Sequence, residues 1–415
     1  MIITEVCHIE TLGERIRKLR KQQQLTLEAL AGKQLTKGML SLIENNKANP
    51  SMESLTYIAE RLGVEVSELL EEVSMQELRD LLEEAEKLYN TEFDVLTDEY
   101  SQLITLVEPY TEKLVQGYEA ARLLEMYSRC LYHEKKEAWR EPSNRAAQIY
   151  EQMKITPRSA SIGIFRAMVK FTEHHYDEAL AILLQERSEI EANNAFIDPM
   201  TRLDLDYTEA ILHFAVGDSE SAIQVMENAI VFSKEEQVFY RIDHLYRLAA
   251  AHAMMKQNDS DYAYYIKKLT QYGDFTDDRD ALFFVKFSKA HYLNSFKKSF
   301  KEAHLLLNSL LEKGDYPKEF DSFLNLEKGI SLFGLQDFEH ALVSLEKVTI
   351  ADYIHHPFDL SSLYQKDAYR ALCHKELGNP VEALRLIDIA IKNISVMPHT
   401  PYKDFIMETY DLITT

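Results

Sequence analysis

A short pattern recurs six times in the C-terminal part of the chain: a polar turn, a residue that is often aromatic, and then an alanine. The alanines are separated by 43, 41, 40, 38 and 42 residues, and they are Ala179, Ala222, Ala263, Ala303, Ala341 and Ala383. Twelve positions before them stand Ala167, Ala210, Ala251, His291, Gly329 and Ala371. All but the histidine are small, as close packing between two helices of a hairpin requires. The spacing therefore predicts a series of stacked helical hairpins.

This pattern resembles the tetratricopeptide repeat, with intervals longer than its usual ~34 residues. The resemblance implies a right-handed superhelix with a concave face suited to an extended peptide. Residues 75–160 are expected to hold two or three weaker hairpins, around Leu123–Trp139 and Asn144–Met153. Counting back from the alanines predicts a peptide-binding inner face, with packing between repeats as the alternative for each residue: Asp204, Tyr207, Phe214, His252, Tyr292 and Gln365.

The N-terminal part holds two short helical patterns back to back, between Thr26 and Pro50. Thr26 is placed to cap a helix over about 27–32, and Thr36 is placed to cap a second helix over about 37–45. Leu40 and Ile43 face inward in the second helix. Two short helices joined by a tight turn are the plan of a helix-turn-helix, whose second helix enters the major groove.

The stretch resembles the helix-turn-helix of phage-repressor (XRE) type, over roughly residues 10–72. The matches include the Arg15–Arg20 run, Thr26-Leu27-Glu28, Leu40-Ser41, Ile43-Glu44-Asn45 and Asn49-Pro50-Ser51. The resemblance implies that Lys37, Gly38 and Ser41 lie near bases. It places a further set near the phosphates or at the caps of the reading helices: Arg17, Thr26, Thr36, Asn45, Asn46 and Lys47.

Charge is divided unevenly along a chain whose net charge is −22. Residues 12–51 carry eight Lys or Arg against three Glu, whereas residues 71–99 carry eleven acids against two bases. A basic end suits phosphate contact, and an acidic body is repelled by the duplex. The distribution favours one DNA-facing end over general affinity for nucleic acids.

Several classes of protein are disfavoured. We find no phosphate-binding glycine loop, nucleophile elbow or Cys-His arrangement, so we predict neither an enzyme nor catalytic residues. The pairs His174-His175 and His355-His356 lack further ligands at metal spacing, and no cofactor is expected. No apolar run approaches membrane-spanning length, no secretion signal is seen, and three isolated cysteines fit a cytoplasmic protein.

The whole arrangement resembles the RRNPP family of cytoplasmic peptide-pheromone receptors of Gram-positive bacteria, and its length is most like the NprR members. The resemblance implies an all-α transcriptional regulator that forms a homodimer, binds a short signalling peptide in its repeats and thereby changes its binding to double-stranded DNA. We expect a DNA-binding domain over 1–72, an acidic linker helix over 73–100 that is also a candidate dimer contact, and repeats over 101–415. Two alternatives remain open: a Rap-like scaffold that binds a response regulator, and a constitutive repressor whose repeats only dimerise.

Overall fold

The computed structural model describes residues 11–66, 69, 75–91, 95–193 and 196–415, and every regular element in these ranges is a helix. The chain forms two compact units, Met1–Arg158 and Ser159–Thr415, which we describe separately. Because these regular elements are all helical, the all-α fold class predicted from the sequence is confirmed. None of the helices in the described ranges is long and apolar enough to cross a membrane.

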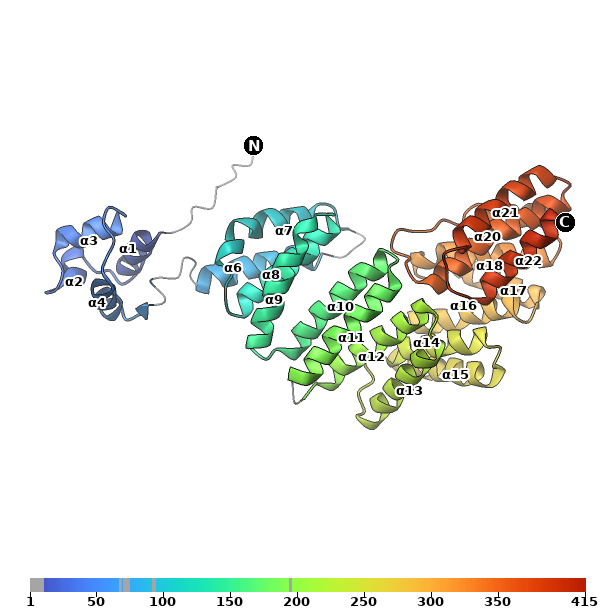
Figure 1. Cartoon of the computed structure of the whole chain (residues 1–415), viewed down its shortest axis with the longest axis horizontal. Coiled ribbons are helices and arrows are strands. Elements are labelled where there is room, and N and C mark those ends of the chain that lie inside the picture. Colours follow the sequence, from blue (N-terminus) through green and yellow to red (C-terminus); the bar gives the residue numbers. More distant parts are fainter. Residues whose placement is uncertain (1–10, 67–68, 70–74, 92–94, 194–195) are drawn as a thin grey trace. The chain divides into compact units, whose positions relative to one another are not determined.

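The fully described helices of the N-terminal domain of the first unit are short (Figure 1): α1 (Leu12–Gln22), α2 (Leu27–Ala31), α3 (Lys37–Glu44) and α4 (Met52–Leu62). A capping box of Thr11 with Glu14 begins α1, and Ser51 caps α4. The core residues include Ile16, Leu30, Leu40, Ile43, Leu55 and Ile58. Residues 67–68 and 70–72 of the expected DNA-binding domain lie outside the described residues.

The remainder of the first unit consists of helices that pack against their neighbours in the chain: α6 (Met75–Tyr89), α7 (Glu99–Val107), η1 (Glu108–Lys113), α8 (Tyr118–His133), η2 (Glu137–Trp139) and α9 (Arg140–Gln152). The acidic helix α6 packs against α7 and α8. Two ion pairs tie it to α8, Arg79 to Glu119 and Arg122 to Glu86, both at 3.3 Å. The apolar stripe of α6 is thus covered by its neighbours, and its predicted contact with a second copy stays a prediction.

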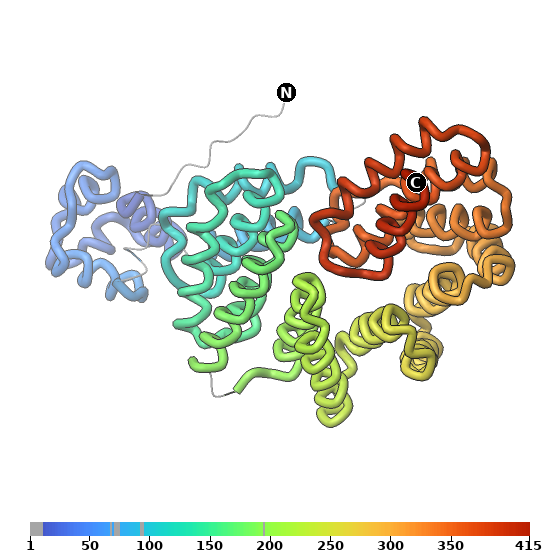
Figure 2. The backbone as a smooth tube through the Cα atoms, turned by 45° about the vertical axis from the view of Figure 1, so that its right-hand side comes forward, coloured from blue at the N-terminus to red at the C-terminus, as the bar shows by residue number. Residues whose placement is uncertain are grey.

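The second unit is a succession of helical hairpins. Helix α10 (Thr156–Thr172) enters it, followed by α11 (Tyr176–Asn193), α12 (Pro199–Val216), α13 (Ser219–Glu235), α14 (Ile242–Met255), α15 (Asp259–Thr276), α16 (Arg279–Ser295), α17 (Phe300–Lys313), η3 (Lys318–Phe320), α18 (Asp321–Gly334), α19 (Phe338–Leu345), α20 (Pro357–Glu376), α21 (Pro380–Ile394) and α22 (Pro401–Thr414). Figure 2 shows the hairpins of this unit following one another along a curved path.

Contacts within the second unit follow the order of the chain. The two helices of each hairpin pack together, as in α12 with α13 and α14 with α15, and the first helices of successive hairpins also touch, as in α14 with α16 and α16 with α18. The first helices therefore share one face of the unit. This is the packing predicted from the resemblance to the tetratricopeptide repeat.

The predicted register was wrong by one residue in the third repeat. A second helix usually begins after an Asp or Asn cap, such as Asp218 or Asn379, and the residue four positions after the cap is buried. In the third repeat the cap is Asn258, so this position belongs to Tyr262, whereas Ala263 is exposed. The fully buried small residue of the facing helix is correspondingly Ala250. A tyrosine occupies the position that alanine holds elsewhere, and the neighbouring alanine misled the alignment.

Gly329 illustrates why the facing position is small. A Cβ atom added there would lie 2.5 Å from Cγ of Leu345, a side chain of the paired helix α19. Because this distance is far below van der Waals contact, even alanine would force α18 and α19 apart. The predicted close approach is therefore present in this hairpin.

Candidate functional site

The α2–turn–α3 segment is fixed at both helix starts by threonine caps. The Thr26 hydroxyl accepts a hydrogen bond from the backbone N–H of Ala29 at 3.0 Å, and the Thr36 hydroxyl accepts one from Met39 at 3.1 Å. Leu30 in α2 and Leu40 in α3 are fully buried. The cap and the buried side chains together determine which face of α3 points away from the domain.

That outer face of α3 carries the residues predicted to read DNA. Lys37, Gly38 and Asn45 are exposed and Ser41 is half-buried. A Cβ on Gly38 would meet nothing closer than the Thr36 hydroxyl at 3.9 Å, so packing does not require glycine there. Lys37 pairs with Glu28 at 3.4 Å, but both side chains are largely exposed. Such a surface pair is weak and leaves the lysine available to a stronger partner.

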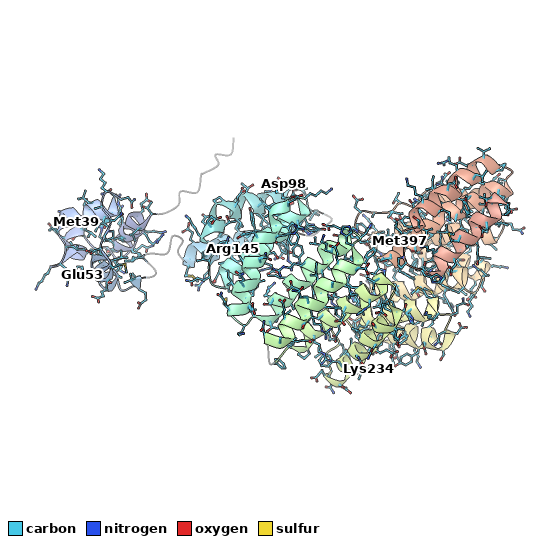
Figure 3. All side chains as sticks on the ribbon, in the orientation of Figure 1. Met39, Glu53, Asp98, Arg145, Lys234 and Met397 are labelled. Carbon is cyan, nitrogen blue, oxygen red and sulfur yellow. The ribbon has the colours of Figure 1, made fainter. Side chains whose placement is uncertain are left out.

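Two apolar side chains on the same face were not among the residues predicted to contact DNA. Met39 is 47% exposed and Leu42 is 44% exposed, although the apolar pattern of the sequence places Met39 with the core and gives Leu42 no role. Figure 3 marks Met39 on α3, where its side chain projects outward. Apolar side chains at this position can contact thymine methyl groups in a major groove. The sequence does contain a signal for this exposure. Leu40 and Ile43 are enough to form the inward-facing apolar stripe of such a short helix, which leaves Met39 and Leu42 on the outside.

The two asparagines after α3 already hold the local structure. The Asn45 amide donates to the Ser41 carbonyl at 2.6 Å, and the Asn46 amide donates to the Thr11 hydroxyl at 2.5 Å. The Asn46 side-chain oxygen also accepts from the backbone N–H of Gly13 at 3.2 Å. The side chain of Asn46 thus joins the end of α3 to the start of α1. Its predicted phosphate contact stays a prediction, as does that of its neighbour Lys47, which is exposed.

The basic patch is smaller than the sequence suggested, because two of its eight cations are internal. Arg15 is 4% exposed and donates to the Leu69 carbonyl at 2.9 Å. Arg20 pairs with the buried carboxylate of Glu44 and donates to the Leu25 carbonyl. The remaining cations of the patch are exposed or half-buried: Arg17, Lys18, Lys21, Lys33, Lys37 and Lys47. They are the ones that can meet phosphates.

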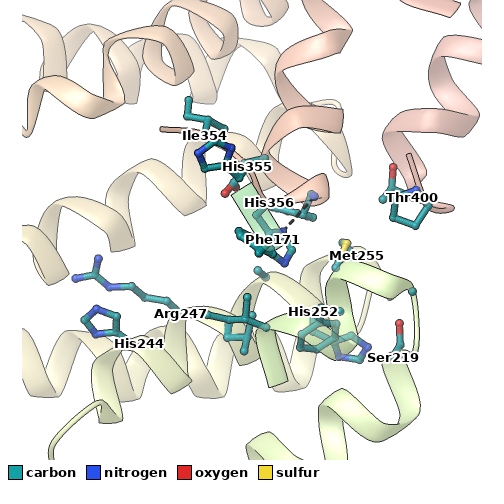
Figure 4. A pocket seen from close by; sticks show the side chains of 18 of the residues that line it. Phe171, Ser219, His244, Arg247, His252, Met255, Ile354, His355, His356 and Thr400 are labelled. Carbon is teal, nitrogen blue, oxygen red and sulfur yellow. Dashed lines mark hydrogen bonds between the residues drawn. The ribbon is translucent and has the colours of Figure 1, made fainter. Parts of the chain in front are cut away.

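A cavity of about 1020 Å³ lies in the second unit. Its walls come from the shared face of the first helices, through residues of α10, α12, α14, α16 and α20, with Phe323 of α18. The segment before α20, with Tyr353–His356, and the turn Pro398–Pro401 complete the lining. Figure 4 shows His244, Arg247 and His252 on one side, and Ile354, His355 and His356 on the side facing them.

The lining combines aromatic rings with imidazoles. Phe171 contacts the rings of both His355 and His356, and Phe214 lies beside His252. Burial lowers the pKa of His252, and it lowers the pKa of His356 to about 4. These imidazoles are therefore neutral at pH 7. Such a wall provides apolar surface with a few hydrogen-bonding groups, as ligand sites commonly do.

The structure brings together three of the six residues predicted to bind a peptide. Tyr207, Phe214 and His252 line the cavity. Asp204 lies one turn before Tyr207 and is not part of the lining. It forms an ion pair with Arg241 at 2.8 Å, and the guanidinium of Arg241 lies over the Tyr207 ring. Tyr292 and Gln365 do not reach it. Tyr292 packs against Tyr262 and bonds to Asp259, and Gln365 is 3% exposed and donates to the Ser362 carbonyl.

Much of the lining was beyond the reach of the sequence pattern, because it comes from segments between helices. The carbonyl of His355 accepts a hydrogen bond from the Tyr176 hydroxyl at 2.8 Å. His355 Nδ1 also lies 3.5 Å from His174 Nε2. The segment before α20 is thus held against the turn between α10 and α11. No repeat rule relates these two parts of the chain.

The N-terminal domain matches the family model described as "Helix-turn-helix domain" over residues 13–74. The chain is 35% identical over 82 residues to the immunity repressor protein of Bacillus phage phi105, covering 20% of this chain and 53% of that protein. It is 41% identical over 63 residues to the HTH-type transcriptional regulator DdrOP3 of Deinococcus deserti, covering 15% of this chain and 49% of that protein. The chain thus spans about half the length of these curated relatives. The N-terminal part of the chain therefore contains a helix-turn-helix domain, as predicted.

Solved structures similar to this chain include PlcR of Bacillus thuringiensis in complex with the peptide PapR7 and DNA. It is 18% identical with a TM-score of 0.35, and the match covers 65% of this chain and 96% of PlcR. The competence regulator ComR of Streptococcus vestibularis, in complex with its signalling peptide XIP, is 17% identical with a TM-score of 0.39. That match covers 68% of this chain and 98% of ComR.

Proposed function

We propose that the chain is a cytoplasmic, DNA-binding transcriptional regulator whose repeat unit binds a short signalling peptide and forms a homodimer. The observation that carries this proposal is the presence, in one chain, of a helix-turn-helix whose α3 exposes Lys37 and Gly38 and of a large aromatic cavity on the shared face of the repeats. The first element suits an operator, and the second suits a ligand that controls it.

Operator binding rests on the outer face of α3. Lys37, Gly38 and Ser41 are proposed to face base edges, with Met39 and Leu42 against thymine methyl groups. Arg17 and Lys47 are proposed to contact phosphates, which fix the register of the domain on the duplex without reading its sequence. Thr26 and Thr36 act mainly by holding the two helix starts.

Peptide binding rests on the size and lining of the cavity. About 1020 Å³ lies at the upper limit of the ~300–1,000 Å³ that small-molecule pockets occupy, which suits several peptide residues better than a single small metabolite. Tyr207, Phe214 and His252 offer rings and hydrogen-bonding groups from two successive first helices. A peptide that binds one curvature of these helices better than another shifts the population of the two states.

The division into a DNA-binding domain over 1–72, a linker helix over 73–100 and repeats over 101–415 is retained as a proposal. The proposed regulator is not an enzyme, and it requires neither cofactor nor metal. A response regulator is retained as a second candidate partner.

The decisive experiment measures binding of the full-length protein to DNA from upstream of its own gene, with and without a peptide extract of spent medium. We expect DNA binding that changes with the extract and no longer changes after the extract is treated with a peptidase. Binding that is indifferent to the extract would contradict peptide control and favour a constitutive repressor. Absence of DNA binding in both conditions would contradict the regulator itself.

A further inference from the structure

Asp359 is a carboxylate without a partner inside the aromatic cavity. It lies in the first turn of α20, three residues after the cap His356. It lines the main cavity and also a smaller hollow of about 240 Å³ beside it. Within the described part of the chain, its carboxylate takes part in no hydrogen bond or ion pair. In particular, it does not bond back to the cap residue as the carboxylate of a capping box would.

Two basic side chains line the smaller hollow together with Asp359, and each lies close to another group. Arg247, which lines both hollows, lies 3.6 Å from the Asp243 carboxylate with its guanidinium over the Phe284 ring. His291 lies between Glu327 and Tyr402, with both ring nitrogens at 2.6 Å from their partners. Both basic side chains therefore contact groups other than the Asp359 carboxylate.

The other neighbours in the lining are aromatic. Phe320, Phe323 and Phe358 line both hollows together with Asp359, and the rings of Phe320 and Phe323 lie 6.0 Å apart. Faces of aromatic rings attract cations, and a carboxylate beside them adds a charge-assisted hydrogen bond. An unpaired carboxylate that is withdrawn from solvent is costly; Asp359 is half-buried, and desolvation raises its pKa to about 6. A bound cation would remove this cost.

We propose that Asp359 anchors a positively charged group of the bound peptide, which sits between its carboxylate and the rings of Phe320, Phe323 and Phe358. The group is a guanidinium or an ammonium, supplied by an Arg or Lys side chain or by the α-amino group. This inference rests on the proposed peptide-binding function and names the chemistry that its ligand must carry.

The test uses the full-length protein and synthetic hexapeptides randomised at every position, prepared with free and with acetylated N-termini. The protein is immobilised as wild type, as Asp359→Asn and as Asp388→Asn, and the retained peptides are sequenced. Asp388→Asn is the matched control, because it makes the same change at an exposed residue of α21 that does not line the cavity. Melting curves establish that each variant is folded, which is expected because the asparagine replaces a carboxylate that has no partner.

Wild type and Asp388→Asn are expected to select basic residues at one position if a side chain supplies the cation. They are expected to select only peptides with a free N-terminus if the α-amino group supplies it. Asp359→Asn should lose that selection and bind the selected peptide about tenfold to a hundredfold more weakly. Its affinity for the counterpart with citrulline, or with the acetylated N-terminus, should hardly change.

Two results separate failure of the anchor from failure of the proposed function. Retention of peptides without any preference for a cation, or with the same preference in Asp359→Asn, would overturn the anchor and leave peptide binding standing. Retention of no peptide by folded wild-type protein would overturn peptide binding, and the anchor with it.

Discussion

The guanidinium of Arg20 in α1 holds the carboxylate of Glu44 at the end of α3 through two parallel hydrogen bonds, Nε to Oε1 at 2.6 Å and Nη2 to Oε2 at 2.7 Å. The Glu44 side chain is only 3% exposed and that of Arg20 is 11% exposed. The pair therefore fixes the C-terminal end of α3 against α1 from inside the domain. It sets the orientation of the helix that is proposed to read DNA.

Replacing Arg20 with Ala should destabilise the helix-turn-helix domain by about 3–5 kcal/mol, because the Glu44 carboxylate would remain buried without a counter-charge. Hydrogen exchange of the α1 and α3 amides in the full-length protein measures this effect. The double variant Arg20→Met with Glu44→Met removes both charges and should recover most of the protection. Unchanged exchange in the single variant would show that the pair contributes little.

Lys37→Ala together with Ser41→Ala should weaken operator binding by about 1–3 kcal/mol for each base that is no longer recognised, without changing the helical content. Titration of labelled operator at fixed salt measures the decrease in affinity. Lys87→Ala serves as a control for charge, because it removes one largely exposed lysine from α6, outside the helix-turn-helix domain. Equal affinities of the α3 variant and the control would refute the assignment of the reading face.

Gly329→Ala should destabilise the α18–α19 hairpin by about 1–3 kcal/mol, because the added methyl group overlaps Leu345. Hydrogen exchange in α18 and α19 is the appropriate measurement. The same substitution at Gly38 meets open space, so it should leave α3 as stable as before or slightly more stable. Similar behaviour of the two variants would contradict the close approach at Gly329.

The buried imidazole of His356 should make stability depend on pH. Its pKa is lowered to about 4 by burial, whereas an unfolded histidine titrates near 6.5. Between these values the unfolded state binds more protons, so the free energy of unfolding should fall as the pH falls from about 6.5 to about 4. Asp359, whose pKa is raised to about 6, acts in the opposite direction over much of this range.

The contribution of His356 is isolated by comparison with His356→Asn. Asparagine can still accept the hydrogen bond that His356 Nδ1 accepts from the Phe358 N–H, but it does not titrate. In denaturant unfolding of both proteins between pH 4 and 7, the free energy of unfolding should fall more steeply toward acid in the wild type than in the variant. Parallel curves would indicate that the imidazole is not buried in its neutral form.

Features that depend on neighbours in sequence could be predicted from the chain alone. The caps Thr26 and Thr36 and the hairpin period follow from local hydrogen bonding and from packing between adjacent helices. The error at Ala263 arose where a tyrosine took the buried position and left no small residue to mark it. The buried position can be predicted from the local sequence only when Asn258 is recognised as the residue that caps the helix.

Features that depend on distant residues could not be predicted. The ion pair between Arg20 and Glu44 removes a cation from the basic patch, and nothing in the spacing of the two residues reveals it. Tyr292 and Gln365 were assigned to the inner face by counting along a helix. Their side chains pack against neighbouring side chains instead and do not reach the cavity. The cavity, which was predicted only in part, shows the same limit, because His355 lines it from a segment outside the repeat pattern.

The bond between the Tyr176 hydroxyl and the His355 carbonyl joins residues 179 positions apart. A repeat array in which each hairpin touches only its neighbours can open from either end, one hairpin at a time. Here the turn that begins α11 is tied to the segment that precedes α20, so the hairpins between them belong to a closed loop. Opening any one of them strains this tie. We therefore expect the second unit to unfold with the cooperativity of a globular domain, and we expect removal of an internal hairpin to disrupt the whole unit instead of shortening it.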